Sequence, residues 1–172
     1  MTFLINSTKV EKFRNLYFSN QITIKIIGGG TQNILYDFFP SPPNQTLANE
    51  EEKTISSDNK ISDLIEGENI IIMKWENSKV NNANYMFSQL NNLLEVDLSN
   101  FDVSEITEMN NMFNGCSNLT SVNLNNLNAP ILTDMGSMFR ECESLLFLNL
   151  SSFVAPLLAT MENMFYQCSS LK

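Results

Sequence analysis

Apolar residues return at a fixed interval of 26 along the second half of the chain. A Met-Phe pair recurs four times in this step, starting at Met86, Met112, Met138 and Met164. Other apolar columns keep the same step: Leu93, Leu119, Leu145 and Leu171; Val96, Val122 and Leu148; Leu98, Leu124 and Leu150; Phe101, Leu127 and Phe153. Such a period is typical of repeat proteins, in which each unit buries its apolar side against the next.

Two kinds of spacing occur within one repeat. Val96 and Leu98 alternate with polar residues, which predicts a short strand. The later columns recur at three- and four-residue intervals, which predicts a short helix. In the first full repeat these columns are Ile106, Met109, Met112 and Phe113. Pro130 and Pro156 suit a first helical turn, and Gly115 suits a helix end. We therefore predict an α/β leucine-rich-repeat solenoid, with parallel strands on the concave face and short helices on the convex face.

The columns extend backwards from the first full repeat. The residues 26 positions before Val96 and Leu98 are Ile70 and Ile72, which are also apolar. We predict a repeat array over residues 61–172, with a degenerate first rung at about 68–83 and full coils from about residue 86.

The residues before the array predict two further parts. Residues 1–39 are expected to form an N-terminal cap, in which residues 21–27 and 33–36 make a β-hairpin around three glycines. A short amphipathic helix is expected near residues 10–17. Residues 40–60 carry three prolines and a run of glutamates with little to bury, so we predict a flexible acidic linker.

Charge and hydropathy narrow the choice of partner. The net charge is −9, and Arg140 is the one basic residue between Asn81 and Leu171. Such a surface repels phosphate backbones, so we expect no nucleic acid partner. No apolar run is long enough for a spanning helix and the start does not resemble a signal peptide, so no membrane insertion is expected. Leu171 stands at the first strand position of a new rung. Either a helix over residues 156–166 caps the array, or the chain is a fragment of a longer array whose open edge invites pairing and self-association.

Residues suited to catalysis are few. The chain has no histidine, and Glu95, Asp97 and Asp102 have no acidic counterpart in the next repeat. Cys116, Cys142 and Cys168 share one column with Leu90, which favours buried free thiols over a disulfide between adjacent coils. We predict no enzyme activity, no cofactor and no metal.

The outward strand positions remain as the candidate binding surface. Side chains that alternate with the buried columns predict a partner-binding strand face. Its residues are Glu95, Asp97, Ser99, Asn123, Asn125, Phe147, Asn149 and Ser151, with Ser121, Ile71 and Met73 also predicted to point outward. The alternative is that these side chains only solvate the sheet and bond along it.

Residues 109–119 and 135–145 carry the pattern Met-x-x-Met-Phe-x-x-Cys-x-x-Leu. This pattern resembles the repeats of BspA-like leucine-rich-repeat surface proteins. The resemblance implies display at a cell surface or outside the cell, and adhesion to a protein or glycan. The missing export signal supports the alternative of a cytoplasmic structural or scaffold protein.

Overall fold

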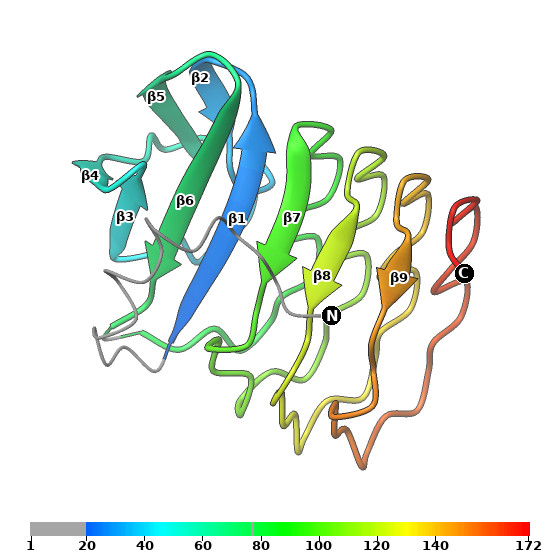
Figure 1. Ribbon diagram of the computed structural model, residues 1–172. Helices are drawn as coiled ribbons and strands as arrows, with labels where there is room; N and C mark the ends of the chain where they lie inside the picture. Colours follow the sequence, from blue (N-terminus) through cyan, green and yellow to red (C-terminus); the bar gives the residue numbers. More distant parts are fainter. Residues whose placement is uncertain (1–19, 77) are drawn as a thin grey trace.

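The described part of the chain folds into nine strands joined by turns. The computed structural model describes residues 20–76 and 78–172, and these residues contain no helix (Figure 1). The strands are β1 (Gln21–Ile27), β2 (Gly30–Asn33), β3 (Gln45–Ala48), β4 (Glu51–Lys53), β5 (Lys60–Leu64), β6 (Glu68–Lys74), β7 (Leu93–Asp97), β8 (Ser121–Asn123) and β9 (Phe147–Leu148). The amphipathic helix predicted near residues 10–17 lies outside the described residues.

Seven of the strands form one mixed sheet in the order β4-β3-β6-β1-β7-β8-β9. β1 is antiparallel to both β6 and β7, whereas β7, β8 and β9 are parallel. The parallel pairs join Val96 to Val122 and Val122 to Leu148, so they follow the 26-residue step. The predicted α/β leucine-rich-repeat solenoid is wrong, because the sheet is mixed and none of the described residues forms a helix to cover it.

One side of the main sheet faces the hydrophobic core. A single row of paired residues crosses six strands and contains Ala48, Ile71, Ile24, Val96, Val122 and Leu148. All of these side chains are buried except that of Leu148, which is half-buried. Burial on one face fixes the register, because a slip of one residue would turn every apolar side chain outward.

The predicted β-hairpin does not form. β1 and β2 follow each other in the chain but do not pair, and β2 pairs with β5 in a separate two-stranded sheet. Ile22, Ile24 and Ile26 are fully buried, so β1 is most stable as a central strand with a neighbour on each side. Those neighbours, β6 and β7, are distant in sequence.

Residues 40–60, predicted as a flexible linker, instead contribute two strands to the main sheet. β3 pairs with β6, and β4 pairs with β3 at the edge of the sheet. Asn59 is buried and donates to the carbonyl oxygens of Tyr36 and Phe39. The indole of Trp75 donates to the carbonyl of Ser41 at 2.9 Å. These hydrogen bonds satisfy buried polar groups and so fix a segment that is polar in composition.

The predicted first rung is out of phase with the later ones. Ile71 and Met73, predicted to point outward, are fully buried, and Ile70 and Ile72 occupy the opposite face of β6. The cause is β1, which lies between β6 and β7 and so replaces the expected parallel pairing.

Turns stand where helices were expected. We call residues 83–90, 109–116, 135–142 and 161–168 the Met-Phe segments of the four coils. Alternate residues in the first three segments donate their backbone N–H to the next coil, as in Phe87 to Met112 and Phe113 to Met138, both at 2.9 Å. The residues between them close tight turns, such as Ser88 to Tyr85 at 2.9 Å. We call the bonds between coils the turn ladder.

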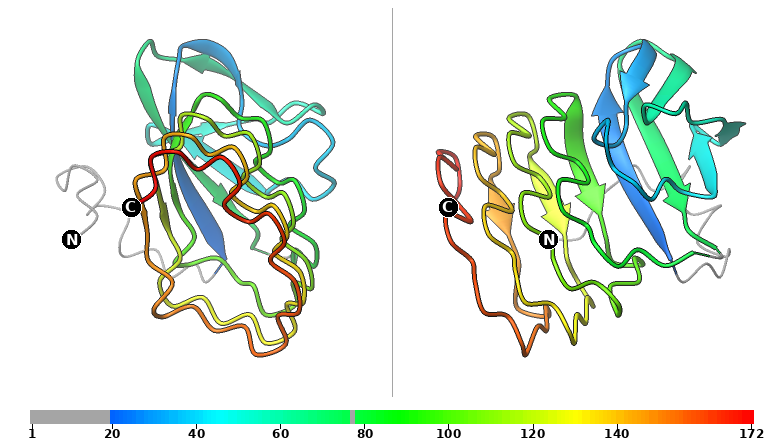
Figure 2. Two further views of the ribbon diagram at one scale, coloured as in Figure 1. Left: turned by 90° about the vertical axis from the view of Figure 1, so that its right-hand side faces the viewer. Right: turned by 180° about the vertical axis from the view of Figure 1, so that it is seen from behind.

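The turn ladder explains why a helix does not form. A helical N–H bonds within its own segment, so it cannot also bond to a neighbouring coil. Each segment instead has two residues with positive φ at a four-residue spacing. These residues are Tyr85, Asn111, Ser137 and Asn163 at the first position, and Gln89, Gly115, Glu141 and Gln167 at the second. Viewed along the stack, the segments superimpose from coil to coil (Figure 2).

Aromatic rings follow the same step inside the stack. Phe87, Phe113 and Phe139 are fully buried, and neighbouring rings lie nearly parallel with centroids 5.4 and 5.3 Å apart. Phe165 extends the row at 5.9 Å but is 39% exposed. Each ring thus supplies the apolar cover of the next, and the row joins the coils into one core.

Candidate interaction surface

The side of the sheet opposite the core is not covered by any described helix or strand (Figure 1). We call it the open sheet face. Two rows of paired residues define it: Ile70, Lys25, Glu95, Ser121 and Phe147 in one, and Leu47, Ile72, Thr23, Asp97 and Asn123 in the other. The face therefore combines apolar side chains on β6 with charged and amide side chains on β1, β7 and β8.

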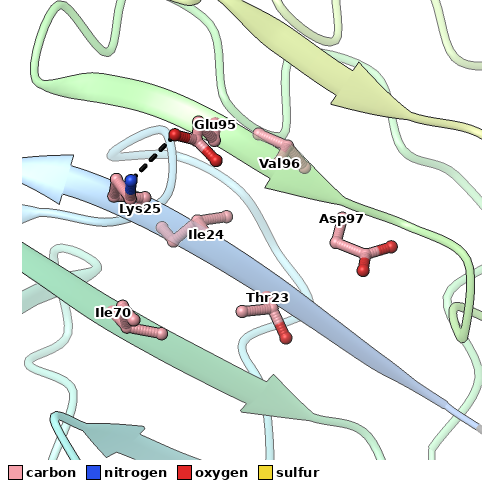
Figure 3. Close-up of a pocket in the computed structure, with 7 residues that line it drawn as sticks. All are labelled: Thr23, Ile24, Lys25, Ile70, Glu95, Val96 and Asp97. Atoms are coloured by element: carbon pink, nitrogen blue, oxygen red, sulfur yellow. Dashed lines mark hydrogen bonds and ion pairs between the residues drawn. The ribbon is translucent and has the colours of Figure 1, made fainter. Parts of the chain in front are cut away.

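Lys25 lies at the centre of the open sheet face. Its Nζ donates to Glu95 Oε1 at 2.8 Å (Figure 3). The same Nζ lies 3.4 Å from a carboxylate oxygen of Glu68. The side chains of Lys25 and Glu95 are 19% and 25% exposed. The hydrogen bond to Glu95 raises the pKa of Lys25, and this effect exceeds the opposing effect of burial.

The Lys25 ion pair gives a testable stability prediction. Lys25→Met is expected to lower the free energy of unfolding by about 1 kcal/mol at pH 7, because Glu95 then loses its charged partner. Because the pKa of Lys25 is raised in the folded state, this contribution is present at neutral pH and is lost as the pH rises through that raised value. Urea unfolding at pH 7 and above pH 10.5 measures both effects.

Lys79→Met is the matched control. Its ion pair with Glu105 is equally short at 2.7 Å, but both side chains are more than half exposed. Solvent screens such a pair, so the substitution is expected to leave stability nearly unchanged. Equal losses for the two variants would contradict a partly buried ion pair on the open sheet face.

The open sheet face carries a small hollow. A hollow lined by Thr23, Lys25, Ile70 and Asp97, among others, has a volume of about 10 Å³ (Figure 3). Pockets for small ligands typically have volumes of several hundred Å³, so this hollow fits little more than one water molecule. The geometry is that of a broad surface.

The predicted strand-face residues divide into two groups. Glu95, Asp97, Asn123 and Phe147 belong to β7, β8 and β9 and share the open sheet face. The remaining four lie in the turns that follow these strands: Ser99, Asn125, Asn149 and Ser151.

Three residues of the predicted surface also fix the turns. Asp97, Asn123 and Asn149 each accept a hydrogen bond from the backbone N–H two residues later, at 2.9, 3.1 and 3.0 Å. Asn123 also donates to Asp97 at 2.9 Å. The bonds to the backbone are those of Asx turns, so part of the polar ladder has a structural role.

The sequence prediction missed the part of the open sheet face that β1 and β6 supply. Thr23, Lys25, Ile70 and Ile72 all lie on it. The alternation of isoleucines in β1 indicated a strand with one polar face, but the pattern gave no sign of its partners.

The three cysteines are free thiols, as the sequence predicted. Each Sγ donates to a backbone carbonyl of the preceding coil, with acceptors Phe87, Phe113 and Phe139. Burial raises the pKa of Cys116 to about 12 and also raises that of Cys142. Cys168 is only partly buried.

Thiol reactivity is expected to follow this burial. In the native protein at pH 8, iodoacetamide is expected to modify Cys168 first and to leave Cys116 and Cys142 unmodified, since the thiolate is the reactive form. In denaturant all three should react at similar rates. Mass spectrometry of timed samples measures this, and native modification of Cys116 as fast as that of Cys168 would contradict the stacked arrangement.

Two features of the described residues bear on metal binding and on membranes. Within residues 20–76 and 78–172, no three Cys, Asp or Glu side chains are grouped so that they could hold a metal ion. The same part of the chain contains no helix that could cross a membrane.

Comparison with known proteins places the chain in a family. Residues 57–172 match the family described as "Mycoplasma protein of unknown function, DUF285". No curated protein and no solved structure matches the chain. The match runs from β5 through all four coils and covers more than half of the sequence, so the chain is a member of the DUF285 family.

Proposed function

We propose that this protein is a non-enzymatic binding module that holds a macromolecular partner on its open sheet face. The observation that carries the proposal is the breadth of this face, which extends over β6, β1, β7, β8 and β9 without a described element on top. A flat surface with a hollow of about 10 Å³ suits a protein or glycan better than a small molecule.

The chemistry of the face favours a protein partner with mixed character. Ile70 and Ile72 offer apolar area, while Glu95 and Asp97 offer carboxylates beside Lys25. Phe147, which is 65% exposed, lies on β9 at the end of the row that contains Lys25 and Glu95. Exposed aromatic side chains often contribute strongly to binding, so Phe147 is the anchor that we propose.

The resemblance of the Met-Phe repeats to those of surface adhesion proteins is a second reason for this proposal. It favours a partner outside the cell or on another cell. A partner captured by photo-crosslinking from position 123 on the open sheet face would be purified and its affinity measured directly.

The decisive comparison uses two variants. Phe147→Ser removes the exposed ring from the open sheet face, and Ile131→Ser removes a 40% exposed apolar side chain from a turn. We expect Phe147→Ser to weaken binding of the purified partner at least tenfold, since buried aromatic anchors contribute about 2 kcal/mol. Ile131→Ser is expected to bind normally. A third variant, Glu95→Lys, changes a charged residue of the open sheet face. The proposal would be refuted if neither Phe147→Ser nor Glu95→Lys bound the partner more weakly than the unmodified chain does.

A further inference from the structure

Asn114 and Gly115 form the one Asn-Gly pair in the sequence. They belong to the second Met-Phe segment, and the matching pairs in the other three segments are Ser-Gln, Arg-Glu and Tyr-Gln. Asn-Gly is the dipeptide most prone to spontaneous deamidation, because glycine has no side chain to obstruct attack by its own backbone nitrogen. The pair is therefore a candidate site of covalent modification, and the surrounding contacts determine when its atoms can react.

The reaction needs water and no other reagent. The backbone nitrogen of Gly115 loses its proton and attacks Cγ of the Asn114 side chain, so that an N–Cγ bond forms and Oδ1 takes the negative charge. The Cγ–Nδ2 bond then breaks, and Nδ2 leaves as ammonia with a proton in place of the one that the backbone nitrogen lost. Water opens the remaining cyclic imide to aspartate or isoaspartate. In isoaspartate the main chain runs through the former side chain and is longer by one carbon.

The turn ladder engages the attacking nitrogen. The N–H of Gly115 donates to the carbonyl oxygen of Arg140 in the next coil at 2.8 Å. A backbone N–H in such a bond gives up its proton to solvent only when the bond opens. Because the attack begins with loss of that same proton, the nitrogen of Gly115 is not a nucleophile while the second and third coils are joined at this point.

The side chain of Asn114 is also unsuited to the reaction in the folded state. Its Nδ2 donates to Oδ1 of Asn111 at 3.0 Å. Its Oδ1 is buried and has no hydrogen-bond partner among the described residues. The negative charge of the intermediate would develop on this oxygen, and a buried oxyanion without donors is strongly disfavoured. Both reacting groups are thus inactive as long as the segment keeps its native contacts.

We propose that Asn114 is a deamidation site controlled by the turn ladder, closed while Gly115 is bonded to Arg140 and reactive when the two coils separate there. The products cannot restore the native bond. The cyclic imide has no hydrogen on the nitrogen of Gly115, and the longer main chain of isoaspartate displaces that nitrogen from its register with Arg140. Deamidation at Asn114 therefore marks chains in which the stack has opened, and it hinders their closure.

The test places a second Asn-Gly pair outside the turn ladder. Asn126→Gly creates one at positions 125 and 126. Asn126 has a φ of 65°, close to the 75° of Gly115, so glycine fits there without strain. The N–H of residue 126 makes only an exposed 3.4 Å contact to the hydroxyl of Ser152. The two pairs therefore match in sequence and in φ but differ in the hydrogen bond of the attacking nitrogen.

The folded Asn126→Gly protein is incubated at pH 8 for several weeks, and mass spectrometry of digested samples measures deamidation at Asn114 and Asn125. We expect Asn114 to react at least about tenfold more slowly than Asn125, because only the N–H of Gly115 is closed by the ladder. In urea the two should react at similar rates. Equal rates in the folded protein would overturn the proposal. An equally slow Asn114 in urea would also overturn it, since the difference would then come from the neighbouring sequence.

Discussion

Phe113→Ala is expected to lower the free energy of unfolding by about 3–5 kcal/mol, the range for removal of a fully buried aromatic side chain. Phe113 is fully buried between Phe87 and Phe139, with ring centroids 5.4 and 5.3 Å away. Its removal leaves a cavity that both neighbouring coils border, and the backbone bonds of the turn ladder restrict how far the coils can collapse into it. Urea unfolding followed by circular dichroism measures the loss.

Phe147→Ala is the control for this prediction. Phe147 is 65% exposed on the open sheet face, so its truncation is expected to change stability by less than about 0.5 kcal/mol. If the two alanine variants lost similar amounts of stability, the phenylalanine row would not be the centre of the core.

Ser137→Pro is expected to cost about 3 kcal/mol or more, the usual penalty for proline where an N–H and an incompatible φ are both lost. Ser137 has a φ of 55°, and its N–H donates to the carbonyl of Glu162 at 2.8 Å. Proline cannot adopt a positive φ, and it has no backbone N–H to donate to Glu162. Thermal unfolding of the variant measures the effect.

Ser137→Gly separates the turn ladder from a helix. Glycine adopts positive φ without the cost that other residues bear, so this variant is expected to be as stable as the unmodified chain or more stable by up to about 1 kcal/mol. In the interior of a helix the same change would destabilise, because glycine is a poor helix former. A clear loss of stability in Ser137→Gly would therefore argue for the helix.

The sequence predicted the repeat correctly, because the coils of Phe87, Phe113 and Phe139 bury the same columns. The positions of Val96 and Val122 follow directly from the step of 26, and so does the row of stacked rings. The columns containing Met86 and Cys116 were correctly expected to be buried.

The helices were predicted wrongly because the apolar spacing does not distinguish a helix from consecutive tight turns. Ile106, Met109, Met112 and Phe113 are all buried, as the pattern requires. The pattern contains no information on whether a backbone N–H bonds within its segment or to the next coil. The positive φ at Asn111 and Ser137 was the missing signal, and asparagine at the first of these is a residue that tolerates it.

The N-terminal part was predicted wrongly for a different reason. The strand expected at residues 21–27 does form, as β1. Its pairing partners, however, are set by contacts between residues far apart in sequence. β1 inserts between β6 and β7 because its three isoleucines need cover from both sides, and this insertion places Lys25 beside Glu95. The open sheet face was consequently predicted only in its β7 to β9 half.

The central claim is that neighbouring coils are joined by backbone hydrogen bonds from one Met-Phe segment to the next. NMR detection of scalar couplings across hydrogen bonds tests it most directly, in the deuterated and isotope-labelled protein. We predict a coupling between the amide nitrogen of Phe113 and the carbonyl carbon of Met138, whose oxygen lies 2.9 Å from that nitrogen. A coupling from Phe113 to the carbonyl of Met109, four residues earlier, would instead indicate a helix and contradict the account.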